Sequence, residues 1–190
     1  MEKVSVIGQG YVGFPLAIQI AHAKFVVFGI DSDEKKIQNL KLESKKIFQR
    51  SDTSIKNLIK KNIYVPSTNR ALVAESNICI VCLPTPLDKS GNPNTNLLED
   101  ELGKISKIIR SGTLLILEST VAPGYCFEVL GHFAQSLNLK RKISIDIAFS
   151  PERIDPLNQK WDVKNTPKLV AGLTDKARER AIEFYSKFID

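Results

Sequence analysis

Short apolar runs of strand length alternate along the chain with longer segments whose apolar residues recur at helical spacing. The apolar runs predict strands at residues 3–7, 25–30, 77–83, 113–117, 144–149 and 168–171. The segments between them predict helices at about 11–22, 33–42, 54–60, 97–109 and 123–137, and a last helix begins near Thr174. Strands that are apolar almost throughout are typical of a parallel sheet with helices on both faces. The pattern therefore predicts a doubly wound α/β fold, with a mainly parallel sheet in a three-layer αβα arrangement.

A glycine-rich turn joins the first predicted strand to the first predicted helix, and it reads Gly8-Gln-Gly10-Tyr-Val-Gly13. In such a turn Gly8 permits a tight bend, Gly10 lets the backbone approach a pyrophosphate, and Gly13 lets the helix pack closely on the strand. The helix start then offers unpaired N–H groups to phosphates. Asp31 ends the second strand, where its carboxylate can bind the adenosine ribose and repel a 2′-phosphate. These residues predict a Rossmann-type site for NAD rather than NADP; the alternative is a tight turn with a capping aspartate and no cofactor.

Three further segments follow predicted strands and combine proline with hydroxyl, carboxylate or guanidinium groups. They are residues 82–86, 118–124 and 150–154. Each segment alone is typical of an ordinary turn or helix cap, because Ser, Thr, Glu and Pro favour such places. Ligands of open α/β sheets, however, bind outside the carboxyl ends of the strands. The common position of the three segments at that edge indicates a single site beside the glycine turn.

Taken in this order, the motifs resemble the N-terminal half of the UDP-glucose/GDP-mannose dehydrogenase family, the nucleotide-sugar 6-dehydrogenases. The resemblance spans nearly all 190 residues and rests on residues 8–17, 84–86, 118–124 and 150–156. Arg153 and Ile154 make the last motif similar to the branch that acts on UDP-N-acetylhexosamines, whereas the UDP-glucose branch usually has Pro-Glu-Phe-Leu. The resemblance implies an NAD-binding Rossmann-like domain over residues 1–190. It also implies that the chain is cut before the family's central dimerisation helix and C-terminal UDP-sugar-binding domain.

The resemblance also implies a reaction and a set of cofactor contacts. The family oxidises the sugar C6 alcohol to a carboxylate with two NAD+, through a thioester on a cysteine of the missing half. The residues that would line the NAD site are Gly8, Gly10, Tyr11, Val12, Gly13, Asp31, Lys36, Pro84, Thr85, Glu118 and Thr120. Among them, Asp31 and Lys36 would bind the adenosine ribose, Thr85 the middle of the dinucleotide, and Thr120 the nicotinamide end.

The same resemblance makes Thr120 and Glu152 the candidate catalytic residues. Glu152 would act as a general base or would position water, which requires a pKa tuned upward by its surroundings. Arg153 and Ile154 would contact the sugar nucleotide. The segment after them reads Asp-Pro-Leu-Asn where the branch commonly has Pro-Gly, so the shape of this loop is a departure from the family. Without the missing half, the chain is expected to bind NAD and to catalyse nothing.

Composition and charge exclude several classes of protein. The chain is 43% hydrophobic and 25% charged, with a net charge of +6, which is typical of a globular domain. Its lysines are scattered and have no interleaved aromatic residues for base stacking, so no nucleic-acid partner is expected. No apolar run approaches the roughly 20 residues that a membrane span requires. No metal-ligand spacing occurs, so no metal site is expected.

The three cysteines, Cys79, Cys82 and Cys126, are an odd number, and nothing at the N-terminus is typical of a signal peptide. We therefore expect a reducing, cytoplasmic compartment. Cys79 and Cys82 lie in an apolar run and are interpreted as core residues. Cys126 begins a predicted helix that could activate it mildly, although packing is the favoured interpretation.

Several interpretations remain open at this point. The favoured one is the NAD-binding domain of a UDP-N-acetylhexosamine 6-dehydrogenase that supplies sugar acids for capsule or other surface polysaccharides. The alternatives are a UDP-glucose 6-dehydrogenase, a 3-hydroxyacid or 6-phosphogluconate-type dehydrogenase, and a non-enzymatic NAD-binding module. Expected partners are NAD+, a UDP-sugar and, through the missing half, a second copy in a homodimer. Loss of that half is expected to expose Phe184, Tyr185 and Phe188 on the last helix and to lower solubility.

Overall fold

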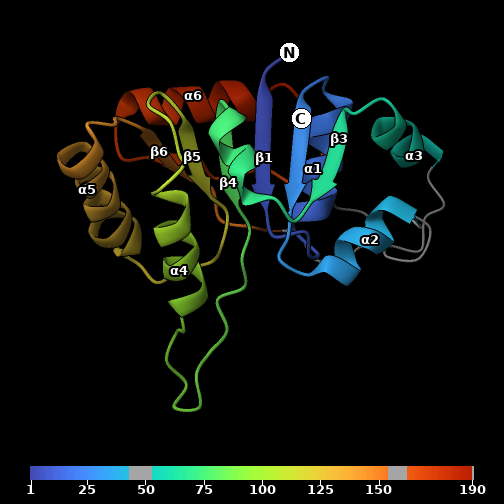
Figure 1. The fold of residues 1–190 in the computed structure, drawn as a ribbon. Coiled ribbons are helices and arrows are strands. Elements are labelled where there is room, and N and C mark those ends of the chain that lie inside the picture. The colour runs from blue at the N-terminus through green and yellow to red at the C-terminus, as the bar shows by residue number, and fades with distance from the viewer. Residues whose placement is uncertain (43–52, 154–161, 190) are drawn as a thin grey trace.

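The computed structural model describes residues 1–42, 53–153 and 162–189, and within these ranges one seven-stranded sheet forms the centre of the molecule (Figure 1). The spatial order of the strands is β3-β2-β1-β4-β5-β6-β7. The strands are β1 (Lys3–Ile7), β2 (Val26–Ile30), β3 (Tyr64–Ser67), β4 (Ile78–Val81), β5 (Leu114–Leu117), β6 (Asp146–Phe149) and β7 (Ala171–Gly172). All neighbouring pairs are parallel except β6 and β7, which are antiparallel. The doubly wound, mainly parallel fold predicted from the sequence is confirmed.

Helices cover both faces of this sheet. They are α1 (Gly13–His22), α2 (Glu34–Leu42), α3 (Thr53–Lys60), α4 (Asn96–Ile105), α5 (Gly131–Arg141) and α6 (Asp175–Tyr185), together with the 3-10 helix η1 (Arg70–Glu75) and the π-helix η2 (Cys126–Leu130). None of the helices in the described ranges is long and apolar enough to cross a membrane.

Alternate residues of the central strands enter two separate hydrophobic cores, because successive side chains of a strand point to opposite faces. Ile80 packs with residues of α1, α2, α3 and α6, whereas its neighbours Cys79 and Val81 pack with residues of η1, α4 and α5. The buried strands are therefore apolar on both faces, which explains their nearly continuous hydrophobic sequence.

The structure differs from the sequence prediction in four places. The prediction missed β3, a short edge strand whose Pro66 has no N–H to donate, and it missed η1 beside it. The strand expected at 168–171 begins only at Ala171 and continues to Gly172, as β7. The helix expected from about residue 123 consists of the π-helical turn η2 followed by α5, which continues to Arg141.

The expectation of an exposed apolar face on the last helix is wrong. The exposed fractions of Phe184, Tyr185 and Phe188 are 2%, 3% and 6%, so all three are buried. The ring of Phe184 lies 5.4 Å from that of Phe25 and 5.1 Å from that of Phe188. Because α6 returns to the sheet after β7, its apolar side packs on the core of this same chain. Its start is as predicted, since the Thr174 hydroxyl accepts a hydrogen bond from the Ala177 N–H at 3.1 Å.

Candidate functional site

A cavity of about 760 Å³ lies at the carboxyl ends of the central strands. It passes the point where the strand order reverses on either side of β1, the usual ligand position of an open α/β sheet. The predicted residues that line it are Gly8, Gly10, Tyr11, Val12, Asp31, Lys36, Pro84, Thr85, Glu118, Thr120 and Glu152. Its volume lies within the usual range for small-molecule sites. The segments after β1, β2, β4, β5 and β6 thus meet in a single cavity, as the sequence predicted.

The glycine turn after β1 is closely packed at two of its glycines and open at the third. Gly8 has φ +90°, and a Cβ there would lie 2.4 Å from the carbonyl oxygen of Cys82. A Cβ on Gly13 would lie 1.9 Å from the carbonyl oxygen of Gly8. A Cβ on Gly10, by contrast, would meet nothing within 4 Å and would occupy space that belongs to the cavity. Gly8 and Gly13 are therefore needed by the fold itself, whereas the open space at Gly10 fits a ligand that approaches the backbone.

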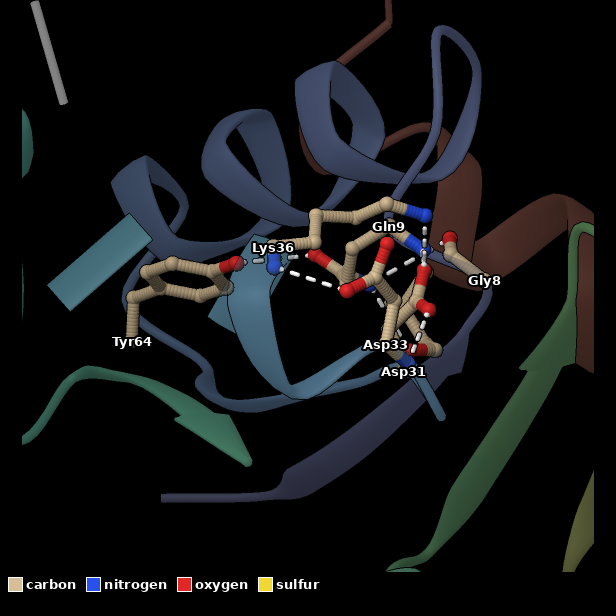
Figure 2. Close-up of polar contacts among 7 residues, drawn as sticks. Gly8, Gln9, Asp31, Asp33, Lys36 and Tyr64 are labelled. Carbon is tan, nitrogen blue, oxygen red and sulfur yellow. Dashed lines mark hydrogen bonds and ion pairs between the residues drawn. The ribbon is translucent and has the colours of Figure 1, made fainter. Parts of the chain in front are cut away.

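Asp31 lies at the end of β2, next to the glycine turn (Figure 2). Its Oδ2 atom accepts hydrogen bonds from the Gln9 N–H at 2.8 Å and from the Lys36 Nζ at 2.7 Å, and its Oδ1 accepts one from the Asp33 N–H at 3.0 Å. Partial burial opposes ionisation, but these hydrogen bonds outweigh it and lower the pKa of Asp31. A carboxylate has about four acceptor positions, so this one can also accept bonds from ribose hydroxyls.

A buried glutamine supports the turn from below, and the sequence analysis missed it. Gln9 is 2% exposed, its Oε1 accepts a hydrogen bond from the Tyr64 hydroxyl at 2.8 Å, and its Nε2 donates to the Val6 carbonyl at 2.8 Å (Figure 2). Tyr64 belongs to the unpredicted strand β3. Burial raises the pKa of its hydroxyl, so it acts as a neutral donor.

The cavity wall near Asp31 carries an ion pair that no motif predicted. The Arg70 guanidinium binds the Glu101 carboxylate in a bidentate manner, through Nε and through Nη2, which lies 2.9 Å from Oε2. Glu101 is 5% exposed and belongs to α4, whereas Arg70 begins η1. Both residues line the cavity together with Leu97 and Lys104. The pair joins two elements on the same side of the sheet.

Two hydrogen bonds connect the segments after β4 and β5. The Thr85 hydroxyl donates to the Thr120 carbonyl at 2.5 Å, and the Ser119 hydroxyl accepts a bond from the Leu83 N–H at 2.9 Å. Thr85 is half-buried at the cavity, whereas Thr120 and Tyr11 of the glycine turn are exposed there. These contacts hold the two loops side by side on the opposite side of the glycine turn from Asp31.

Beneath these loops lies a buried polar cluster around Glu118. Its carboxylate accepts hydrogen bonds from the Lys168 ammonium and from the Tyr185 hydroxyl, and it is fully buried. The Glu152 carboxylate lies 3.9 Å from the same ammonium. Burial raises the pKa of Glu118 to about 7, an effect that Lys168 and Tyr185 counteract and Glu152 reinforces. Lys168 and Tyr185 were missed as site residues, because neither lies in a motif and only the folded chain brings them here.

Of the candidate substrate residues, Glu152 lies at the cavity and Arg153 does not. Glu152 lines the cavity, and its Oε1 accepts a hydrogen bond from the Arg153 N–H at 2.7 Å. The Arg153 side chain does not line the cavity, and its guanidinium donates to the Pro167 carbonyl at 3.4 Å. Ile154 lies outside the described residues.

The three cysteines are free thiols, and burial raises the pKa of each. Cys79 is buried in the core, as predicted, and Cys82 lines the cavity. Cys126 has no depressed pKa, so the start of its helical turn does not activate it. In the described part of the chain, no group of three or more His, Cys, Asp or Glu side chains could hold a metal ion.

Comparison with known proteins shows the family to which this chain belongs. The sequence model described as UDP-glucose/GDP-mannose dehydrogenase family, NAD binding domain, matches residues 2–189. A UDP-N-acetyl-D-mannosamine dehydrogenase of Methanococcus maripaludis is 28% identical over 195 residues, which cover 100% of this chain and 43% of that protein. A UDP-N-acetyl-D-glucosamine 6-dehydrogenase of Pseudomonas aeruginosa is 29% identical over 191 residues, which cover 98% and 44%.

The fold is also similar to that of a UDP-D-ManNAc dehydrogenase from Pyrococcus horikoshii. The TM-score is 0.87 at 24% identity, and the match covers 99% of this chain and 45% of that one. At this identity the similarity shows the fold alone. The chain spans less than half of the length of each of these relatives.

Proposed function

The chain belongs to the UDP-glucose/GDP-mannose dehydrogenase family, and we propose that it is the NAD-binding part of a UDP-N-acetylhexosamine 6-dehydrogenase. The observation that carries this proposal is the single cavity that joins the glycine turn and Asp31 to the Glu118 and Glu152 carboxylates. The N-acetylhexosamine substrate is supported by the names of the two relatives from Methanococcus maripaludis and Pseudomonas aeruginosa.

The arrangement of the cavity supports one orientation of NAD. The adenosine ribose would bind Asp31, whose Lys36 partner keeps the carboxylate in place. The pyrophosphate would lie at Gly10, against the N-terminus of α1, where unpaired N–H groups and the helix dipole favour anions. The other half of the dinucleotide would then extend to Thr85 and Thr120, and its nicotinamide would lie near the Glu118 cluster.

This chain would supply only some of the groups that the whole enzyme needs for its reaction. When bound, NAD accepts a hydride from C6 of the sugar. Glu152 lies at the cavity wall, where a carboxylate can take the proton of the C6 hydroxyl or orient a water molecule. Thr120 contributes a hydroxyl at the same end. The nucleophilic cysteine belongs to another part of the enzyme, because the thiols of this chain have raised pKa values and none of them is activated.

Calorimetric titration of the chain tests the cofactor proposal. NAD+ should bind, NADP+ should bind at least about tenfold more weakly because Asp31 repels a 2′-phosphate, and a UDP-N-acetylhexosamine alone should bind weakly. Asp31→Ala should weaken NAD+ binding. Asp100→Ala is the matched control, since it removes the same charge from an exposed position on α4 and should leave the affinity unchanged. Equal affinity of the Asp31→Ala variant and the wild type would contradict the proposal.

The substrate is tested on the full-length enzyme. It should reduce NAD+ with a UDP-N-acetylhexosamine faster than with UDP-glucose, and the opposite order would favour the UDP-glucose branch. The proposal includes a homodimer of the full-length enzyme, which sedimentation velocity checks. It also includes a reducing, cytoplasmic compartment, which the free thiols support.

A further inference from the structure

The cluster around Glu118 places charged side chains in a buried position beneath the cavity. Among the described residues, four titratable groups face its carboxylate, and each comes from a different segment: Lys168 before β7, Tyr185 on α6, Glu152 after β6 and Cys82 after β4. Glu118 is fully buried, and the Lys168 side chain is 8% exposed. A buried carboxylate is costly unless other groups compensate it, so an ordinary core would have an apolar residue here.

Two donors from different segments bind the Glu118 carboxylate. The Lys168 ammonium contacts Glu118 and lies 5.1 Å above the ring of Tyr185, whose hydroxyl is the second donor to Glu118. In the described part of this cluster, one ammonium, that of Lys168, faces two carboxylates, those of Glu118 and Glu152. Ionisation of Glu118 therefore adds one negative charge to the floor of the cavity.

We propose that Lys168 and Tyr185 are positioning residues that hold Glu118 as a buried anion beneath the nicotinamide end of the cavity, and that this charge makes the domain prefer NAD+ to NADH. The inference rests on the proposed function for the direction in which the dinucleotide lies. The nicotinamide ring is positively charged in NAD+ and neutral in NADH. A negative charge that is shielded from water attracts only the oxidised ring, because the rest of the two molecules is the same.

The pH dependence of this preference has a definite sign. Because burial raises the pKa of Glu118 to about 7, its negative charge is present above that pH and is lost below it. The preference for NAD+ should therefore grow as the pH rises. The other groups that face Glu118 contribute to its position: Lys168 and Tyr185 keep the pKa down, and Glu152 pushes it up.

The test compares the dissociation constants of NAD+ and NADH from about pH 6 to about pH 8.5, on this chain and on its variants. In the wild type, the ratio of the NADH constant to the NAD+ constant should increase on the order of tenfold across this range, as expected for one unit charge at an effective dielectric constant of about 20. Glu118→Gln should keep the ratio at its low-pH value throughout. Glu101→Gln is the matched control: it removes a buried carboxylate at the adenosine end and should change both constants alike.

Two further variants separate positioning from mere packing. Lys168→Met should move the midpoint of the transition to higher pH by more than about one unit, because the balancing charge is lost, whereas Lys168→Arg should leave it near the wild-type value. If Glu118→Gln does not fold, Tyr185→Phe tests the same point. It should move the midpoint of the transition to higher pH by less than Lys168→Met does, since only one hydrogen bond is removed.

The outcomes are distinguishable. A wild-type ratio that does not vary with pH, or a Glu118→Gln variant with the wild-type profile, would overturn this inference while leaving NAD binding in place. Failure of the wild type to bind either form of the cofactor would instead overturn the proposed function.

Discussion

Alanine substitutions at Gly10 and Gly13 should separate ligand binding from folding within a single turn. A methyl group on Gly13 would lie 1.9 Å from the Gly8 carbonyl oxygen, well inside van der Waals contact, and that oxygen is backbone that cannot move alone. Helix α1 would have to shift away from β1, which costs about 3 kcal/mol or more. In a domain of this size, such a loss lowers the melting temperature by roughly 6–12 °C.

A methyl group on Gly10 has no neighbour within 4 Å and projects into open space at the cavity. The free energy of unfolding of Gly10→Ala should therefore change by no more than about 0.5 kcal/mol. Its affinity for NAD+ should fall by at least about tenfold, or roughly 1.4 kcal/mol, because the methyl group occupies the space proposed for the pyrophosphate.

Urea unfolding and calorimetric NAD+ titration of the two variants check these expectations. Gly13→Ala is expected to lose stability, and Gly10→Ala to lose affinity at wild-type stability. Unchanged NAD+ affinity in Gly10→Ala would refute the assignment of the pyrophosphate to this turn. Unchanged stability in Gly13→Ala would refute the close approach of helix and strand.

Three other predictions concern residues that support the site. Tyr64→Phe removes the donor to the buried Gln9 amide and should lower the free energy of unfolding by about 1–2 kcal/mol in urea; an unchanged value would contradict the role of this bond. Phe188→Ser replaces a buried ring with a polar group and should lower the free energy of unfolding by about 3 kcal/mol or more in urea. An unchanged free energy of unfolding would indicate that this ring is exposed after all. Because the folded-state pKa of Asp31 is lowered, its contribution to stability is present above the unfolded value of about 3.9 and is lost as the pH falls through the folded value. Asp31→Asn should consequently flatten the acid side of the stability profile below about pH 4, and a profile with the wild-type slope there would count against the hydrogen bonds to this carboxylate.

Local patterns in the sequence predict much of the fold and the motifs that line the cavity. The alternation of apolar runs and helical periodicity predicts the central strands, because strands buried on both faces have to be apolar throughout. The glycine spacing predicts the turn, since a side chain at Gly8 or Gly13 would collide with backbone. Motifs at strand ends predict the cavity lining, because parallel strands bring their carboxyl ends to one edge. The strand β3 escaped prediction, as its short sequence with Pro66 carries no clear period.

The buried supports of the site were decided by tertiary structure alone. Gln9 meets Tyr64 across 55 positions, and Glu118 meets Lys168 and Tyr185 across 50 and 67 positions. No local pattern marks such partners, because a lysine before a strand or a tyrosine in a helix is equally compatible with an exposed position. The same holds for α6, whose aromatic side chains were interpreted as an exposed face. Their burial depends on the return of the helix to the sheet, which is a property of the packed chain and not of any segment within it.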